Sequence, residues 1–301
     1  MRGFGFSETI AYSFVPETAC DRLRLKAADP RRSLIHILNP LSEDQAVMRT
    51  SLVPGILETM RYNMARQIKN LKIFEIGKIF LENDRQILPR EPEILMALWS
   101  GARIEPSWHG RETPCDFYDI KGAAEALMHS LKLDGIRFTA LAGEACEYTR
   151  PGHTARITAS NLALGLVAEI HPEVRDAYDL KQTAFIFELD LEKISGLIPQ
   201  ALKSKPIPRY PAIYRDITII VDRGIETQSV LEAVDNFQEE LIENLHLFDV
   251  FEGEPIAAGK KSVSFRITYR SPGKTLEDDD VNELHKSITE RLLNLFDATL
   301  P

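Results

Sequence analysis

The stretch from residue 262 to residue 270 alternates two kinds of side chain in a way that could bind nucleic acid. Along S-V-S-F-R-I-T-Y-R, hydroxyl and arginine side chains alternate with apolar ones. Successive side chains of a strand point to opposite faces, so one face would pack on helices and the other would stay open. Such an open face can contact phosphates, riboses and splayed bases, although an ordinary solvated sheet face has the same pattern. The candidate RNA-binding residues are Arg215, Lys260, Lys261, Ser264, Arg266, Thr268 and Arg270.

Other polar residues fit structural roles better than catalytic ones. Asp116 and Asp119 lie where a helix is expected to begin, and carboxylates are favoured at that positive end. His153 and His171 fall at expected turns. The acidic run 277–280 lacks the glycine that a calcium loop needs at its sixth position, so we interpret it as a first helical turn. We therefore predict no metal site and no catalytic residue.

Composition narrows the class of protein. The chain has 301 residues, enough for about two domains, and its net charge of −9 argues against bulk coating of nucleic acid but not against a local basic face. No apolar run reaches the roughly 18 residues that a membrane span needs. Three cysteines without a C-x-x-C pair fit the reducing cytosol. We predict a cytoplasmic protein without a membrane segment.

The first two thirds of the chain has an α+β pattern. A mostly antiparallel sheet with flanking helices is predicted for a domain of residues 1–198. Ser51 can cap one of these helices. The expected strands are 34–38, 71–80, 93–100, 136–141, 155–159, 162–170 and 183–191, and the expected helices are 52–66, 116–132 and 172–179.

A second domain is predicted after a proline-rich linker at 199–211. Residues 212–301 have the order of a ferredoxin-like βαββαβ fold with a short last strand. Thr275 and Asp278 have the spacing of a capping box at the second helix. The expected strands are 215–221, 245–251 and 262–270, and the expected helices are 226–240 and 276–293.

Short motifs that follow one order over nearly the whole chain carry a family resemblance. They include N-P-L-S-E-D-Q-A-V-M-R-T-S-L-V-P-G-I-L, K-I-F-E-I-G-K-I-F, D-F-Y-D-I-K-G, F-E-L-D-L, P-R-Y-P-A-I-Y-R-D-I-T-I-I-V-D and L-F-D-V-F-E-G. Together they resemble the C-terminal half of the bacterial phenylalanyl-tRNA synthetase beta subunit. The resemblance implies a class II synthetase-like antiparallel sheet, followed by a ferredoxin-fold anticodon-binding domain.

The synthetase-like domain is expected to be catalytically silent. Active class II sites hold the α-phosphate of ATP with an arginine in the motif F-R-x-E, and a second arginine binds the γ-phosphate. Leu81 stands at the first of these positions, and the strand F-I-F-E-L-D-L leads into no glycine run and no arginine. Losing both phosphate contacts should remove several kcal/mol of transition-state stabilisation.

The resemblance also implies partners. The whole enzyme would be an ATP- and Mg²⁺-dependent phenylalanine–tRNA ligase, a heterotetramer of two alpha and two beta subunits that acts on tRNA(Phe). This chain would bind no cofactor itself. We expect the chain to begin inside an element, without the long interface helix and the upstream tRNA-binding and editing segments of the family. Binding of the alpha subunit by this chain alone is therefore expected to be weak or absent.

Two other functions remain open at this point. The chain could be a free-standing, divergent class II ligase, or a structural module whose second domain binds no RNA. Phenylalanine-dependent exchange between ATP and pyrophosphate by the chain alone would identify the ligase. Titration with an anticodon stem-loop would identify the module without RNA binding.

Overall fold

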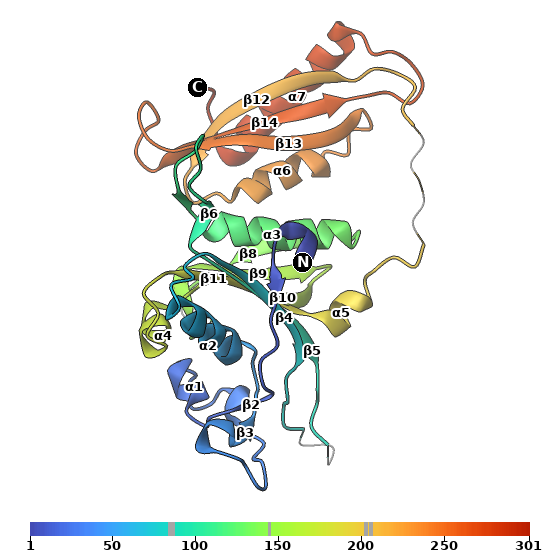
Figure 1. The fold of residues 1–301 in the computed structure, drawn as a ribbon. Coiled ribbons are helices and arrows are strands. Elements are labelled where there is room, and N and C mark those ends of the chain that lie inside the picture. The colour runs from blue at the N-terminus through green and yellow to red at the C-terminus, as the bar shows by residue number, and fades with distance from the viewer. Residues whose placement is uncertain (84–87, 144–145, 202–203, 205–206) are drawn as a thin grey trace. The chain divides into compact units, whose positions relative to one another are not determined.

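The computed structural model describes residues 1–83, 88–143, 146–201, 204 and 207–301 (Figure 1). The chain divides into two compact units, Met1–Leu202 and Lys203–Pro301. The predicted linker includes residues 202–203 and 205–206, which lie outside the described residues. No helix in the described ranges is long and apolar enough to cross a membrane.

A large sheet is the centre of the first unit. In the described part of the chain seven strands form it, in the order β1-β4-β5-β11-β10-β9-β8. Only β1 pairs in parallel, with β4, and the other pairs are antiparallel. This confirms the predicted antiparallel α+β sheet. The bounds are β1 Ser7–Glu8, β4 Leu71–Lys78, β5 Glu93–Ser100, β8 Ile136–Ala140, β9 Thr149–Ala159, β10 Leu162–Ile170 and β11 Ala184–Asp190.

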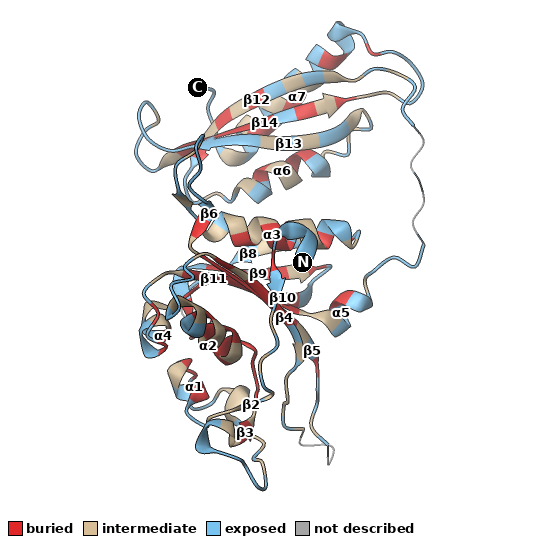
Figure 2. Ribbon diagram, viewed as in Figure 1, coloured by how far each residue is buried: buried red, intermediate tan, exposed pale blue. Residues whose placement is uncertain are grey.

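Helices close both faces of this sheet, as the buried strands in Figure 2 show. One face packs against α1 (Ala19–Arg22), α2 (Val53–Met64) and α4 (Pro172–Ala177). The other face packs against α3 (Phe117–Ser130) and α5 (Leu191–Ser195). The described residues of the unit also include two small sheets and three short 3-10 helices: β2 (Phe14–Val15) with β3 (Val47–Met48), β6 (Ala102–Ile104) with β7 (Thr113–Pro114), and Arg2–Phe4, Pro30–Arg32 and Glu43–Gln45.

Local signals at the helix starts are mostly confirmed. Asp116 and Asp119 form a capping box: Asp116 accepts the N–H groups of Tyr118 and Asp119, and the Asp119 carboxylate accepts the N–H of Asp116 at 2.8 Å. Their structural interpretation therefore holds. The Ser51 hydroxyl accepts the Val53 N–H at 3.1 Å, so it serves the start of α2 from one residue before the cap position.

The strand predicted at 34–38 is wrong. Among these residues only His36 forms a bridge, to Val47, and Leu38 is 93% exposed. The apolar run has no place in the large sheet, because that sheet's edge beside β4 is already taken by β1. It continues instead into the turn that contains Pro40, which has no N–H to donate to a ladder.

The second unit has the predicted ferredoxin-like order. Its strands are β12 (Ile213–Asp222), β13 (Ile242–Phe251) and β14 (Lys260–Tyr269), arranged antiparallel with β14 in the centre. Its helices are α6 (Thr227–Asn236) and α7 (Asp278–Phe296), which bury one face of the sheet. The short last strand is reduced to a bridge between Ile220 and Thr299.

The capping box predicted at Thr275 is wrong. The cap of α7 is Glu277, and no side chain caps it. Asp278, whose carboxylate would accept the N–H of Thr275 in a capping box, instead pairs with Arg215. The acidic run nevertheless forms the first turn of α7, as predicted.

The stability of the second unit should fall in mild acid. His285 on α7 lies 3.0 Å from the Tyr269 hydroxyl, and burial lowers its pKa below the usual value of about 6.5. The unfolded chain thus binds a proton more readily than the folded one. The contribution of His285 to stability is therefore fully present above about pH 6.5 and is lost as pH falls below that value, through the lower pKa of the folded protein. Calorimetry of the whole chain at pH 7.5 and pH 5 should show one transition move to lower temperature on acidification. His285→Gln should reduce that shift, whereas His246→Gln, at an exposed position, should leave it unchanged.

Candidate nucleic-acid interface

The sheet of the second unit has one face that its helices do not cover, which we call the open face. Strand register defines it, because Asp216 and His246 lie opposite Arg266, and Thr218 lies opposite Ser264. The residues of the open face are Tyr214, Asp216, Thr218, Ile220 and Asp222 of β12, Asn244, His246, Phe248, Asp249 and Phe251 of β13, and Lys260, Ser262, Ser264, Arg266 and Thr268 of β14.

The structure places four of the seven candidates on the open face: Lys260, Ser264, Arg266 and Thr268. Arg270 follows directly after β14. Arg215 and Lys261 do not lie there, because their register partners Ile267 and Val221 belong to the buried face. Arg215 donates to Asn282 at 3.1 Å and pairs with Asp278. Of the three residues that were expected to extend the open face, Arg215 therefore links β12 to α7, Lys261 is buried on the helix-packed side, and only Lys260 lies on the open face.

Both arginines near the open face are held by carboxylates. Arg266 donates from Nε and Nη2 to the two oxygens of Asp216, at 2.7 and 2.8 Å. This pairing lowers the pKa of Asp216, so its carboxyl is ionised at neutral pH. Arg270 donates to Glu243 at 2.9 Å and to the carbonyl of Tyr210. The face is thus charge-balanced rather than strongly basic.

Three exposed aromatic side chains on the open face were missed by the sequence reasoning. Tyr214 is 57% exposed, Phe248 49% and Phe251 43%. The ring of Phe248 lies 5.9 Å from the Arg266 guanidinium. Alternation along β13 could not have located Phe248 and Phe251, because a bulge between Leu247 and Asp249 exchanges the faces within the strand. The sequence signal that could have found these three residues is that aromatic side chains on an open sheet face can stack on bases.

The first unit offers no comparable surface for a nucleotide at the position of Leu81. The backbone of Leu81 exchanges two hydrogen bonds of 2.9 Å with Arg90, and its side chain carries no charge. On the α2 face of the sheet, two pairs of buried polar side chains bind one another. Arg49 pairs with Glu75 at 2.6 Å, and Tyr148 donates to Glu188 at 2.6 Å. Burial raises the pKa of Glu188.

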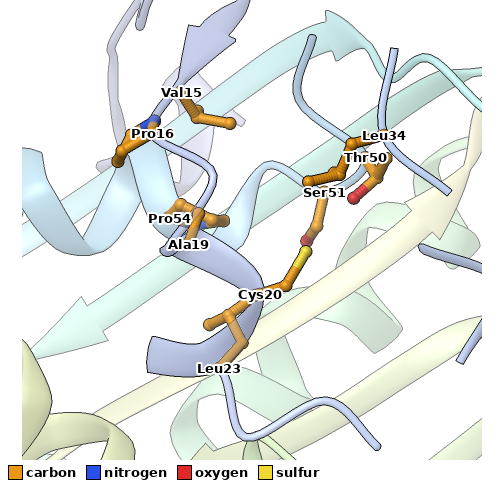
Figure 3. Close-up of a pocket in the computed structure, with 9 residues that line it drawn as sticks. All are labelled: Val15, Pro16, Ala19, Cys20, Leu23, Leu34, Thr50, Ser51 and Pro54. Carbon is orange, nitrogen blue, oxygen red and sulfur yellow. The ribbon is translucent and has the colours of Figure 1, made fainter. Parts of the chain in front are cut away.

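A small cavity lies beside these groups (Figure 3). Its volume of about 10 Å³ holds at most one water. Cys20 and Ser51 point into it, and burial raises the pKa of the Cys20 thiol, which weakens it as a nucleophile. Among the described residues no three His, Cys, Asp or Glu side chains are grouped to hold a metal ion. The residues that line this cavity therefore do not fit ATP or Mg²⁺. The lining consists of Val15, Pro16, Ala19, Cys20, Leu23, Leu34, Thr50, Ser51 and Pro54.

Comparison with known families and proteins gives matches over both units. Residues 1–191 match the family described as phenylalanyl tRNA synthetase beta chain CLM domain, and residues 208–301 match the ferredoxin-fold anticodon binding domain. The phenylalanine–tRNA ligase beta subunit of Syntrophus aciditrophicus is 42% identical over 98% of this chain and 36% of its own length. The Geobacter sulfurreducens beta subunit is 35% identical over 100% of this chain and 37% of its own length.

Among solved structures, the pyrrolysyl tRNA synthetase PylSc of Desulfitobacterium hafniense is similar to part of the chain. It is 15% identical, with a TM-score of 0.48 over 64% of this chain and 61% of its own. The chain spans little more than a third of the length of the curated relatives that it matches, at 36% and 37%.

Proposed function

The chain belongs to the family of phenylalanyl-tRNA synthetase beta chains, and from this premise we propose that it serves phenylalanine–tRNA ligase as a non-catalytic part. Its first unit would support the alpha subunit in a heterotetramer of two alpha and two beta subunits. Its second unit would bind the anticodon region of tRNA(Phe) during ATP-dependent aminoacylation in the cytoplasm. The domain limits of the proposal are 1–198 and 212–301, joined by the linker 199–211.

The proposed scaffold role rests on what replaces a catalytic site in the first unit. Leu81 supplies no charge for a phosphate, and helices pack on both faces of the sheet. Carboxylates that could assist chemistry are paired instead, as Glu75 is with Arg49. ATP and Mg²⁺ would then be bound by the alpha subunit, and these features disfavour a free-standing ligase.

The exposed aromatic side chains of the open face are the single observation that carries the RNA-binding proposal. Unstacked bases bind aromatic rings on open sheets, and such stacking contributes about 1–3 kcal/mol per base. The acidic residues Asp216, Asp222 and Asp249 on the same face repel phosphates. We infer that the face binds bases of a single-stranded loop more than it binds backbone. A module without RNA binding would have no use for three exposed rings on one face.

Phe251→Ala should weaken binding of the tRNA(Phe) anticodon stem-loop by about tenfold or more, because it removes one stacking ring. Fluorescence anisotropy with the whole chain and a labelled stem-loop measures this. Val250→Ala is a matched control: Val250 and Phe251 are both 43% exposed, but Val250 lies opposite Val263 on the helix-packed face. Equal losses in the two variants would contradict the assignment of the open face. Undetectable binding by the wild-type chain would contradict the RNA-binding proposal itself.

A further inference from the structure

The central cation of the open face already has an anion bound to it. Arg266 offers its Nε and Nη2 groups as a pair of parallel donors, the geometry that suits a carboxylate or a phosphate. Asp216 fills this edge with two hydrogen bonds of 2.7 and 2.8 Å. Both side chains are about half-exposed, at 50% for Arg266 and 44% for Asp216, so the pair faces the space that RNA would enter.

We propose that Asp216 is a specificity-determining residue, which occupies the phosphate-binding edge of Arg266 and so excludes RNAs that offer only their backbone. This inference rests on the proposed binding of RNA at the open face, and it concerns how that face rejects wrong partners. Specificity often requires an element that penalises competitors in addition to contacts that favour the correct ligand.

The position of Asp216 is fixed by the sheet. It lies directly opposite Arg266 in the β12–β14 ladder, and the neighbouring pair of Thr218 and Ser264 is joined by a hydrogen bond of 2.9 Å. The pairing lowers the pKa of Asp216, which keeps the competitor charged at neutral pH. A phosphate must therefore displace a carboxylate that the backbone holds in place.

Binding of bases does not carry the same penalty. The ring of Phe251 is exposed on β13 opposite Ser262, four residues along β14 from Arg266, and stacking on it requires no break in the Arg266–Asp216 pair. The second arginine nearby, Arg270, is likewise held by a carboxylate, that of Glu243. An RNA with splayed bases can thus use the face as it stands, whereas a continuous backbone finds its main cation engaged.

The test compares two RNA probes on the whole chain: the tRNA(Phe) anticodon stem-loop and an unrelated hairpin of equal length. Asp216→Asn should raise affinity for the unrelated hairpin by about tenfold, since it frees one charge-assisted contact. The slope of log affinity against log salt should steepen by about 0.7, as expected for one added phosphate contact. The stem-loop should gain less, so the ratio between the probes should fall.

Asp222→Asn is the matched control, because it removes one negative charge from the same face of the same strand. It should change affinity for the unrelated hairpin far less than Asp216→Asn does. In an Arg266→Gln background, the gain from Asp216→Asn should vanish. Asp216→Ser, which removes the carboxylate with a different side chain, should reproduce the gain.

Three results would overturn the inference. These are equal gains in the two aspartate variants, a gain that survives Arg266→Gln, or a loss of affinity for both probes, which would make Asp216 a support for Arg266 rather than a competitor. Failure of the proposed function is distinguishable from these. If the wild-type chain binds neither probe and Asp216→Asn binds both, anticodon binding fails while the competitor role of Asp216 stands.

Discussion

Glu75→Ala is expected to destabilise the first unit by about 3–5 kcal/mol, because it leaves the buried guanidinium of Arg49 without its counter-charge. Arg49 and Glu75 are both almost fully buried and lie 2.6 Å apart. The remaining partners of Arg49 are backbone carbonyls, of Lys78 at 2.9 Å and Ala11 at 3.4 Å, which carry no charge. The sheet is built around this group: a side chain at Gly77 would place its Cβ 2.3 Å from Arg49 Nη2.

Urea unfolding followed by tryptophan fluorescence measures the loss. Trp99 is buried in β5 and reports on the sheet, whereas Trp108 is 97% exposed and should change little. Glu93→Ala is the control, because Glu93 is an exposed carboxylate on the neighbouring strand, opposite Lys78. It should cost less than about 1 kcal/mol, as surface charges usually do. A similarly small cost for Glu75→Ala would mean that Arg49 does not depend on this partner.

Gly165→Ala should be at least as damaging, with a loss of about 3 kcal/mol or failure to fold, because the added methyl group meets backbone. A Cβ at this position would lie 1.8 Å from the carbonyl oxygen of Glu188 and 2.8 Å from its carbonyl carbon. These atoms belong to β11, which pairs with β10 in the middle of the sheet. A side-chain tip could rotate away, but here the two strands would have to separate.

Gly122→Ala is the matched control for that variant. Gly122 lies inside α3, and a Cβ there would meet no atom within 4 Å. Replacing glycine by alanine in a helix interior should stabilise the unit by about 0.5–1 kcal/mol. The same chemical change should therefore lower the urea midpoint in Gly165→Ala and raise it in Gly122→Ala. If Gly165→Ala unfolds at the wild-type midpoint, the close approach of β10 and β11 is not required for stability.

Local patterns in the sequence were sufficient for most elements. The alternation along residues 262–270 correctly predicted which side chains of β14 pack against the helices, because Val263, Phe265, Ile267 and Tyr269 are all in the core. It did not predict that Ser262 and Ser264, on the other face, are also buried. The start of α3 could be predicted from Asp116 and Asp119, since a capping box involves residues only three apart. The strand prediction for residues 34–38 was wrong because a short apolar stretch indicates burial but does not identify the strand with which it would pair.

The candidate site was harder to predict because it depends on contacts between distant residues. The pair of Asp216 with Arg266 joins positions 50 residues apart, and only the register of β12 on β14 brings them together. The same register places Arg215 and Lys261 on the buried face, although both are cations. The pairing of strands in the folded sheet therefore decides which charges are already neutralised. The order of residues along the chain does not predict it.

The bulge in β13 has an evolutionary consequence. In a regular strand, the gain or loss of one residue exchanges the two faces for everything beyond it. At Phe248 the extra residue is already accommodated, since Leu247 and Asp249 lie opposite the adjacent residues Phe265 and Ser264. A single-codon deletion at this position would leave Phe251 and Val250 facing as they do now. Lineages can therefore gain or lose one aromatic ring of the open face in one genetic step, without rebuilding the core beneath it.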